Sequence, residues 1–250
     1  NRFILFLKNP GRVASILRKS TRVVVGNAWL GEYASKYNRE VTVIPTAVDT
    51  TRFVPRSAAS GDGQSRDLVI GWIGSPTTFP YLEAIAPVLR MVAEKHRFVL
   101  KVSGAGRPVN FPGVRVADVP WSMADEVSLF NSCDAGVYPL PNDEWSKGKC
   151  GFKAIQCMAC GVPVVASAVG VNTTIIEDGI NGFLATTESE WVEKLSRLLS
   201  DAALRRQFAV AGRQRIEERY SLRVTAPQLK AVFDAAVSAQ PAGVRAEGRT

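Results

Sequence analysis

The chain has 250 residues, of which 46% are hydrophobic and 22% are charged, so it can bury a core of ordinary size. Its 31 basic and 23 acidic residues give a net charge of +8, which favours anionic partners but does not distinguish nucleotides, nucleic acid and lipid headgroups. No uncharged apolar run reaches about 18 residues, which excludes a membrane-spanning helix. Lys8 and Pro10 cut the first apolar run, which excludes a secretory signal.

The first 25 residues combine basic and apolar side chains and contain no acidic residue. The basic residues are Arg2, Lys8, Arg12, Arg18, Lys19 and Arg22, with apolar residues between them at roughly helical spacing. This pattern is typical of a helix that lies on an anionic membrane surface, and equally of a solvated helix. No RNA-binding signature accompanies the charge, so nucleic acid is not an expected partner.

The next elements are a strand at 22–25, a helix that begins after Asn27 and a strand at 41–44. A Gly/Ser/Asp-rich stretch follows and is typical of an exposed linker, so we expect a domain boundary between Pro45 and Arg66. Beyond it, strands and helices alternate. The predicted strands are 68–73, 98–103, 114–116, 135–138 and 163–167, and the predicted helices are 81–95, 124–131, 152–159, 189–199 and 204–219.

This alternation predicts an α/β fold with a Rossmann-like parallel sheet and helices on both faces. Such sheets bind ligands outside the carboxyl ends of their strands. Three glycine-containing loops fall there: 74–78, 104–107 and 139–151. The second is not a full G-x-G-x-x-G motif, because position 109 is Val, so a dinucleotide site is poorly supported.

The most informative stretch is WSKGKCGFKAIQCMACGVPVVAS, residues 145–167. Lys147, Lys149 and Lys153 surround two glycines directly before a predicted helix and strand. A glycine turn at a helix N-terminus presents backbone N–H groups to an anion, and the helix dipole adds to the attraction. The stretch is therefore a candidate phosphate site, although a plain solvated loop has the same pattern.

Four cysteines lie at Cys133, Cys150, Cys157 and Cys160, and the last two form a C-x-x-C pair. No second pair exists and the single histidine, His96, is remote in sequence, so we expect neither a metal site nor redox chemistry. The lone histidine also makes a Ser-His or Cys-His triad improbable. Buried, reduced thiols in a cytoplasmic protein are the default expectation.

Five ordered motifs carry a resemblance to a known family: GNAWLGEYA, VIPTAVDTTRF, DAGVYPL, KCGFKAIQCMACGVPVVAS and EDGINGFLA. Together they resemble the GT-B glycosyltransferases of retaining family 4, the glycosyl transferases group 1, over roughly residues 21–233. The form here is a subfamily with KCGFKxIQ in place of the usual two-glutamate motif.

The resemblance implies two Rossmann-like domains, an N-terminal acceptor domain and a C-terminal donor domain. We expect residues 1–48 to be a remnant of the first, 49–66 the linker, 67–220 the nucleotide-sugar domain, 221–238 a helix that crosses back, and 239–250 a disordered tail. The chain begins with Asn1 and lacks most of an acceptor domain, so we expect a fragment that is inactive alone.

Departures from the family pattern change the expected site. The two family glutamates, which approach the donor sugar and the ribose, align with Gly148 and Gln156. The family's Arg/Lys pair for the diphosphate aligns with Ser75 and about Pro80, neither of which is charged. Gln156 can still donate to and accept from a ribose. We therefore expect Lys149 and Lys153 to supply the catalytic cations for the diphosphate.

The remaining donor contacts are expected from the loops at the carboxyl edge of the sheet and the start of the 152–159 helix. The complete set of donor-binding residues is Gly74, Ser75, Gly104, Val119, Gly148, Cys150, Gly151, Phe152 and Gln156. Val119 belongs to a base pocket formed by 116–121, where Trp121 either stacks on the base or packs in the core. An acid of the 143–145 loop could orient a sugar hydroxyl, and Asn172 could cap the following segment.

The leading hypothesis is retaining transfer of a sugar from a UDP- or GDP-type donor to a glycan or lipid-linked acceptor, without a metal. We expect the protein in the cytoplasm, with peripheral contact at the inner membrane face through the basic N-terminal helix. Two alternatives remain open. One is a catalytically degenerate nucleotide-sugar-binding or scaffold domain, and the other is a nucleotide-sugar epimerase or hydrolase of the same architecture.

Overall fold

The computed structural model describes residues 11–56 and 67–239. The chain forms two compact units, one built from the described residues up to 46 and from 223 onward, the other from residues 47–222. The apolar residues before position 11, most of the Gly/Ser/Asp-rich stretch and all but the first residue of the expected tail lie outside the described residues.

The first unit contains α2 (Arg12–Lys19), β1 (Val23–Val25), α3 (Ala28–Ser35), β2 (Val41–Val43) and nearly all of α12 (Leu222–Ser238). The two strands pair in parallel, with Val24 opposite Thr42. The Asn27 side chain accepts a hydrogen bond of 2.8 Å from the Leu30 N–H, so the predicted helix cap is confirmed.

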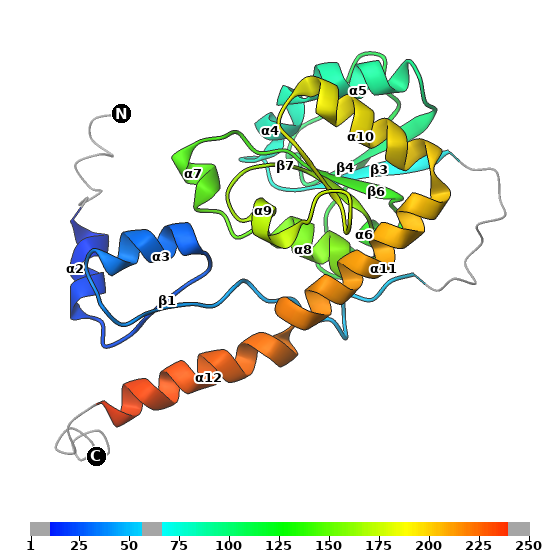
Figure 1. Cartoon of the computed structure of the whole chain (residues 1–250). Helices are drawn as coiled ribbons and strands as arrows, with labels where there is room; N and C mark the ends of the chain where they lie inside the picture. Colours follow the sequence, from blue (N-terminus) through cyan, green and yellow to red (C-terminus); the bar gives the residue numbers. More distant parts are fainter. Residues whose placement is uncertain (1–10, 57–66, 240–250) are drawn as a thin grey trace. The chain divides into compact units, whose positions relative to one another are not determined.

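The second unit contains a six-stranded parallel sheet (Figure 1). Its strands are β3 (Leu68–Ile73), β4 (Phe98–Ser103), β5 (Val116–Val119), β6 (Ala135–Tyr138), β7 (Val164–Ser167) and β8 (Phe183–Ala185). Their order in the sheet is β5-β4-β3-β6-β7-β8, so the direction of strand addition reverses between β3 and β6. The predicted Rossmann-like sheet is confirmed.

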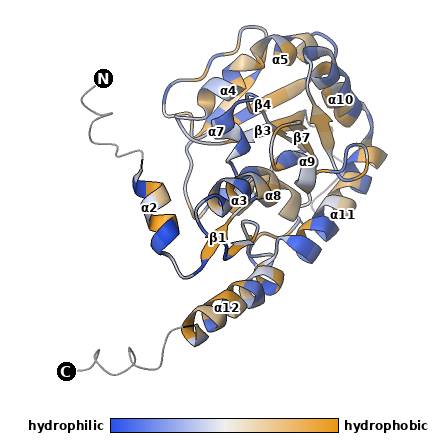
Figure 2. Ribbon diagram, turned by 60° about the vertical axis from the view of Figure 1, so that its left-hand side comes forward, coloured by the Kyte–Doolittle hydropathy of each residue, from blue (hydrophilic) through white to orange (hydrophobic). Residues whose placement is uncertain are grey.

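The helices of this unit are α4 (Phe79–Ala84), α5 (Ala86–Ala93), α6 (Glu126–Asn131), α7 (Glu144–Lys147), α8 (Phe152–Ala159), α9 (Asn172–Ile175), α10 (Glu188–Ser200) and α11 (Ala202–Arg219). Two hydrophobic clusters cover the sheet. One includes residues of α4, α5 and α10, and the other includes residues of α6, α8 and the end of α11. Figure 2 shows that hydrophobic colours gather on the strands between them.

Three predicted boundaries were wrong. The single helix expected over 81–95 is two helices that meet at Ile85, because Pro87 has no N–H and its ring disfavours a continuous helix through the preceding turn. The strand expected over 114–116 is β5, whose pairing with β4 runs from Val116 to Val119. The 143–145 loop instead enters α7, and Asp143 caps this helix by accepting 2.7 Å from the Ser146 N–H.

Residues 49–56, which we expected to belong to the linker, are held within the second unit. Phe53 is buried there, and the neighbouring Val48 pairs with the Tyr220–Leu222 backbone through two hydrogen bonds. Asn131 Nδ2 donates 3.0 Å to the Val54 carbonyl. The segment therefore belongs to the packed unit, because a buried aromatic ring and paired backbone fix it.

Candidate functional site

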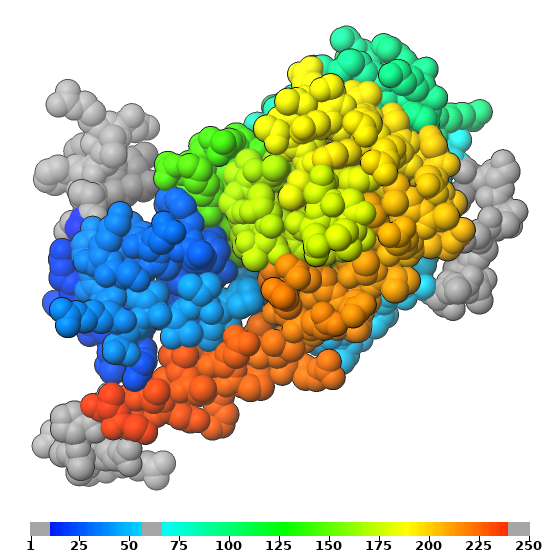
Figure 3. All heavy atoms as spheres, viewed as in Figure 1, coloured from blue at the N-terminus to red at the C-terminus, as the bar shows by residue number. Residues whose placement is uncertain are grey.

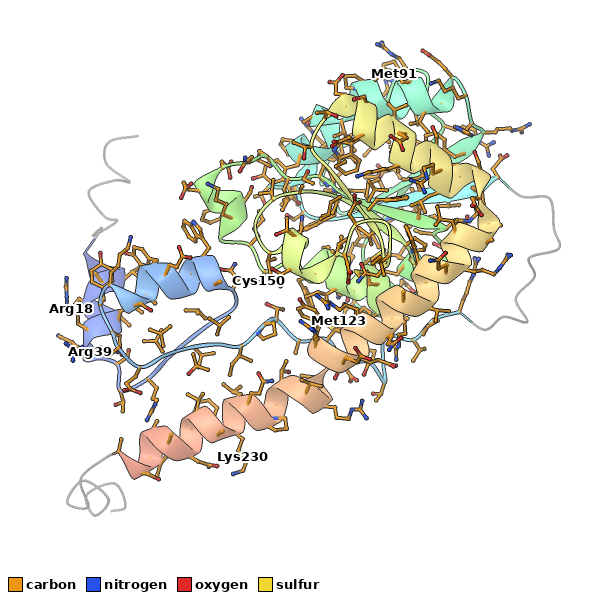
Figure 4. All side chains as sticks on the ribbon, in the orientation of Figure 1. Arg18, Arg39, Met91, Met123, Cys150 and Lys230 are labelled. Atoms are coloured by element: carbon orange, nitrogen blue, oxygen red, sulfur yellow. The ribbon has the colours of Figure 1, made fainter. Side chains whose placement is uncertain are left out.

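The candidate site lies where the strand order reverses. The crossovers that leave β3 and β6 run in opposite directions, and sheets of this kind bind ligands beside the loops that follow two such strands. Side chains connect the loops: Lys149, in the loop after β6, places its ammonium 5.6 Å from the centre of the Tyr81 ring on α4. Figure 4 labels Cys150, the residue that follows Lys149 between α7 and α8.

The start of α8 combines a glycine turn with an uncapped helix end. Gly151 has φ +67°, a left-handed conformation that favours glycine, and an added Cβ would lie 2.3 Å from Ile175 Cδ1. Among the described residues, no side chain caps this helix. No described side chain therefore competes for the N–H groups of its first turn, and with the positive end of the helix dipole they form a candidate anion site.

The three lysines around this turn have different surroundings. Lys147 pairs with Glu144 at 2.7 Å on the exposed α7. Lys149 lies over the rings of Tyr81 and Trp145, 5.8 Å from the centre of the latter. The ammonium of Lys153 donates 2.8 Å to Glu126 Oε1 and 2.9 Å to Gln156 Oε1. Of the three, Lys147 pairs with the exposed carboxylate on α7, Lys153 pairs with the Glu126 carboxylate, and Lys149 lies over two aromatic rings.

The backbones at the starts of the loops after β3 and β4 are in direct contact. Gly74 N–H donates 3.0 Å to the Ser103 carbonyl, and a Cβ on Gly104, which has φ +88°, would lie 2.3 Å from the Gly74 oxygen. The Ser75 hydroxyl lies 2.9 Å from that of Thr77 and 3.2 Å from that of Thr78. A ligand that bonds to Ser75 must compete with this local turn.

The remaining expected site residues are spread along the same edge of the sheet. Gly148 ends α7, and Phe152, which is 40% exposed, begins α8, so both adjoin the glycine turn. Val119 ends β5, three strands away from β6 in the sheet order. Trp121 is 46% exposed and so does not pack in the core. α7 lies on the surface of the second unit, where Figure 3 shows it in green.

Asn172 is not the cap that we expected, because it lies inside α9 and its Nδ2 donates 3.0 Å to the Ser167 carbonyl. Ser167 in turn accepts 2.8 Å from the Leu140 N–H, which fixes the start of the loop after β6. The two bonds together hold this loop against the end of β7.

Two residues that sequence reasoning missed belong to this neighbourhood. Tyr138 ends β6, and burial raises its pKa to about 12, with smaller contributions from Cys150 and Tyr81, so its phenol stays protonated beneath the loop. Glu126, in the first turn of α6, is buried and holds Lys153. No sequence signal links Glu126 to a lysine 27 positions later; only the fold brings them together.

All four cysteines carry thiols, and the C-x-x-C pair is deeply buried. Burial raises the pKa of Cys157 well above its ordinary value and raises that of Cys160 to about 12. Within residues 11–56 and 67–239, no group of three His, Cys, Asp or Glu side chains could hold a metal ion. These thiols therefore have the character of core residues.

The protonated thiols predict a specific pH dependence. Cys160 loses its proton at an ordinary pKa of 9.0 when unfolded and at about 12 when folded, so its contribution to stability is complete below pH 9.0 and is lost as pH rises towards 12. The free energy of unfolding, measured in urea across this pH range, should therefore fall less steeply with pH in Cys160→Ala than in the unmodified chain.

The burial of the two thiols also predicts low reactivity. At neutral pH, native Cys157 and Cys160 should resist iodoacetamide; rapid labelling of either, detected by mass spectrometry, would contradict their burial.

A groove of about 850 Å³ lies elsewhere, between α5 and α10, and includes His96. His96 follows α5 and precedes β4, so it lies at the amino edge of the sheet, opposite the loops described above. Although this groove is large, it is not the expected reaction site, because ligands of such sheets bind at the carboxyl edge.

Residues 70–201, more than half of the chain, match the family described as Glycosyl transferases group 1. The chain therefore belongs to the glycosyl transferases group 1 family. It is 29% identical over 224 residues to the D-inositol 3-phosphate glycosyltransferase of Stackebrandtia nassauensis, covering 79% of this chain and 49% of that protein. The Actinosynnema mirum protein of the same name is 31% identical over 196 residues, an alignment that covers 68% of this chain and 46% of that protein. The chain spans about half the length of the curated relatives it matches.

Solved structures show the same architecture. Sucrose-phosphate synthase from Thermosynechococcus elongatus has a TM-score of 0.73 at 19% identity, covering 91% of this chain and 61% of that one. Anabaena Alr3699/HepE in complex with UDP-glucose has a TM-score of 0.71 at 16% identity, and the match covers 88% of this chain and 65% of that one. At these identities the likeness shows the fold alone, the α/β arrangement of GT-B glycosyltransferases.

Proposed function

We propose that this chain is the donor-binding half of a retaining family 4 glycosyltransferase that uses a nucleoside diphosphate sugar of the UDP or GDP type. The observation that carries the proposal is the uncapped start of α8 at the strand-order reversal, with Lys149 and Lys153 beside it. The family assignment supports it, as does the UDP-glucose complex of a structural neighbour.

In this proposal the diphosphate lies against the N–H groups from Cys150 to Ala154. Lys149 and Lys153 add positive charge, which stabilises the negative charge that develops on the leaving diphosphate. Gln156, one turn into α8, contacts the ribose. The retained configuration and the absence of a required metal are parts of the same proposal, in which a departing phosphate oxygen assists the acceptor on one face of the sugar.

The acceptor belongs to the other half of the proposed enzyme. We propose a glycan or lipid-linked acceptor bound by an N-terminal domain of which this chain contains only the end, so that this chain alone binds donor without transferring the sugar. The coverage of about half of each curated relative supports this division.

Nucleotide binding is the direct test. UDP or GDP should raise the melting temperature of the chain, and Lys149→Met or Lys153→Met should each weaken binding about tenfold, because each removes a charge-assisted contact to phosphate. Lys147→Met is the matched control, since its ammonium pairs with Glu144 on the exposed α7. Absence of any shift with both nucleotides in the unmodified chain would refute donor binding.

A catalytically degenerate binding domain is the second candidate, favoured by Gly148, which has no side chain to reach a donor sugar. A protein that restores the N-terminal domain separates the two. Transfer or slow hydrolysis of a nucleotide sugar, followed by NMR of the products, supports the enzyme, whereas tight binding without turnover of any donor in a panel supports the scaffold.

We also propose a cytoplasmic location with peripheral contact to an anionic membrane through α2. Val13 and Ile16 are 55% and 56% exposed on this helix, beside the exposed Arg12, Arg18 and Lys19. Of the helices in the described residues, none has the length and apolar character needed to cross a bilayer. The chain should sediment with phosphatidylglycerol vesicles at low salt and not with phosphatidylcholine vesicles, and Ile16→Asp should weaken this; equal sedimentation with both lipids would contradict the proposal.

A further inference from the structure

The orientation of the Gln156 side chain is fixed by its neighbour. Gln156 is 1% exposed, and its Oε1 lies 2.9 Å from the ammonium of Lys153. An ammonium group has three donors and no acceptor, so only the carbonyl end of the amide can face it. The Nε2 end is therefore turned away from Lys153, and it makes no hydrogen bond to any residue that the structure describes.

Lys153 is itself held by a buried carboxylate. Glu126 Oε1 accepts 2.8 Å from the ammonium, and the Glu126 side chain is only 8% exposed. The other carboxylate oxygen lies 3.9 Å from a guanidinium nitrogen of Arg52, which also donates 2.7 Å to the Met123 carbonyl. Figure 4 labels Met123, just before α6. The carboxylate thus has cationic neighbours from two separate segments.

The rings beside Lys153 restrict it further. Its ammonium lies 5.8 Å from the ring centres of both Phe130 and Phe152. A partly buried ion pair is weak evidence for stability, since desolvation offsets much of the attraction, but it is well suited to fixing one geometry out of several. Here it distinguishes two orientations of a carboxamide that are nearly equal in shape.

We propose that Glu126 is a positioning residue of the donor site. Through Lys153 it orients Gln156 so that the amide presents Nε2, a donor, to a hydroxyl oxygen of the nucleotide ribose. This inference rests on the proposed function and deepens it: Gln156 recognises an acceptor oxygen of the ribose through Nε2, while Lys153 occupies one lone pair of Oε1. Ribonucleotides should therefore bind better than forms that lack the contacted hydroxyl.

The test compares UDP and GDP with their 2′-deoxy and 3′-deoxy forms by calorimetry. One of the two deoxy forms should bind about fivefold more weakly than the ribonucleotide, the value of one hydrogen bond. This preference should disappear in Gln156→Ala, in Glu126→Ala and in Lys153→Met. The Glu126→Ala/Lys153→Met double variant should have the same ratio of the two affinities as either single variant. The matched control is Glu193→Ala, which removes an exposed carboxylate paired with Arg197.

A ratio of affinities separates positioning from general damage, because a folding defect weakens both forms alike. Glu126→Gln keeps an acceptor for Lys153 and should keep most of the ribose preference. Retention of the full preference in Glu126→Ala would overturn the positioning role, even if nucleotide binding as a whole is confirmed.

A second measurement needs no nucleotide. The side-chain amide resonances of Gln156, assigned by their absence in Gln156→Ala, should shift in Glu126→Ala and in Lys153→Met but not in Glu193→Ala. Unmoved resonances would overturn the proposal whatever the nucleotides do. Failure of every nucleotide to bind the unmodified chain would instead refute the proposed function, and the amide resonances would still decide whether Glu126 positions Gln156.

Discussion

Gly151→Ala should lower the free energy of unfolding by about 3 kcal/mol and remove most of the affinity for nucleoside diphosphates. A left-handed conformation costs a non-glycine residue about 1–2 kcal/mol, and overpacking a core adds about 1–3 kcal/mol. At this position the new Cβ would lie 2.3 Å from Ile175 Cδ1 and 3.2 Å from Val171 Cγ1. Because Ile175 is itself fully buried, we expect the start of α8 to shift, and the proposed phosphate contacts with it.

Urea unfolding and UDP or GDP titration measure the two effects. Gly179→Ala is the control, because Gly179 has φ +79° but nothing within 4 Å of an added Cβ, so it reports backbone strain without the clash. We expect a loss of about 1 kcal/mol there and unchanged nucleotide affinity. Equal losses in the two variants would show that Ile175 does not confine the turn.

Arg213→Met should lower the free energy of unfolding by about 3 kcal/mol, because hydrogen bonds to a charged group are worth about 1.5–3 kcal/mol each. The guanidinium of Arg213, on α11, donates 2.6 Å to the Ala159 carbonyl, 2.8 Å to the Thr50 carbonyl, and also to the Phe53 carbonyl. Its side chain is 17% exposed. It therefore connects α11, the end of α8 and the first residues of the expected linker.

The comparison variant is Arg206→Met on the same helix, where the side chain is exposed. Unfolding in urea should change by less than about 0.5 kcal/mol for this surface substitution. Proteolysis offers a second readout, since residues 47–56 should become susceptible in Arg213→Met and stay protected in Arg206→Met. If both variants unfold at the same urea concentration, the carbonyl contacts of Arg213 contribute no measurable stability.

The strands and helices that carry the site could be read from the sequence. The bounds of β3, β4, β6 and α8 match the predicted ones, because buried parallel strands are continuous apolar runs and α8 follows a glycine turn. The break in the helix at Ile85 could also have been predicted from the sequence, because Pro87 disfavours a continuous helix there. The short α7 had too few residues to give a periodic pattern, although Asp143 is a typical N-cap residue.

Side-chain partnerships were harder to predict than elements. Lys153 was found from its place beside a glycine turn, but its carboxylate partner Glu126 lies on another helix, and helical or strand periodicity carries no information about contacts between elements. The same limit applies to Gln156. Its chemistry allows both donating and accepting, and only the structure shows that its Oε1 accepts from Lys153.

The sequence by itself determined the class of fold, the carboxyl-edge loops and the glycine turn with its lysines, because these depend on local pattern and on the alternation of strands with helices. Only the tertiary structure decided which lysine meets which partner, which thiols are buried and how residues 47–56 are held. Those properties arise from contacts between residues far apart in the chain. A linear pattern does not record such contacts, because packing and charge pairing are settled only when the elements meet in three dimensions.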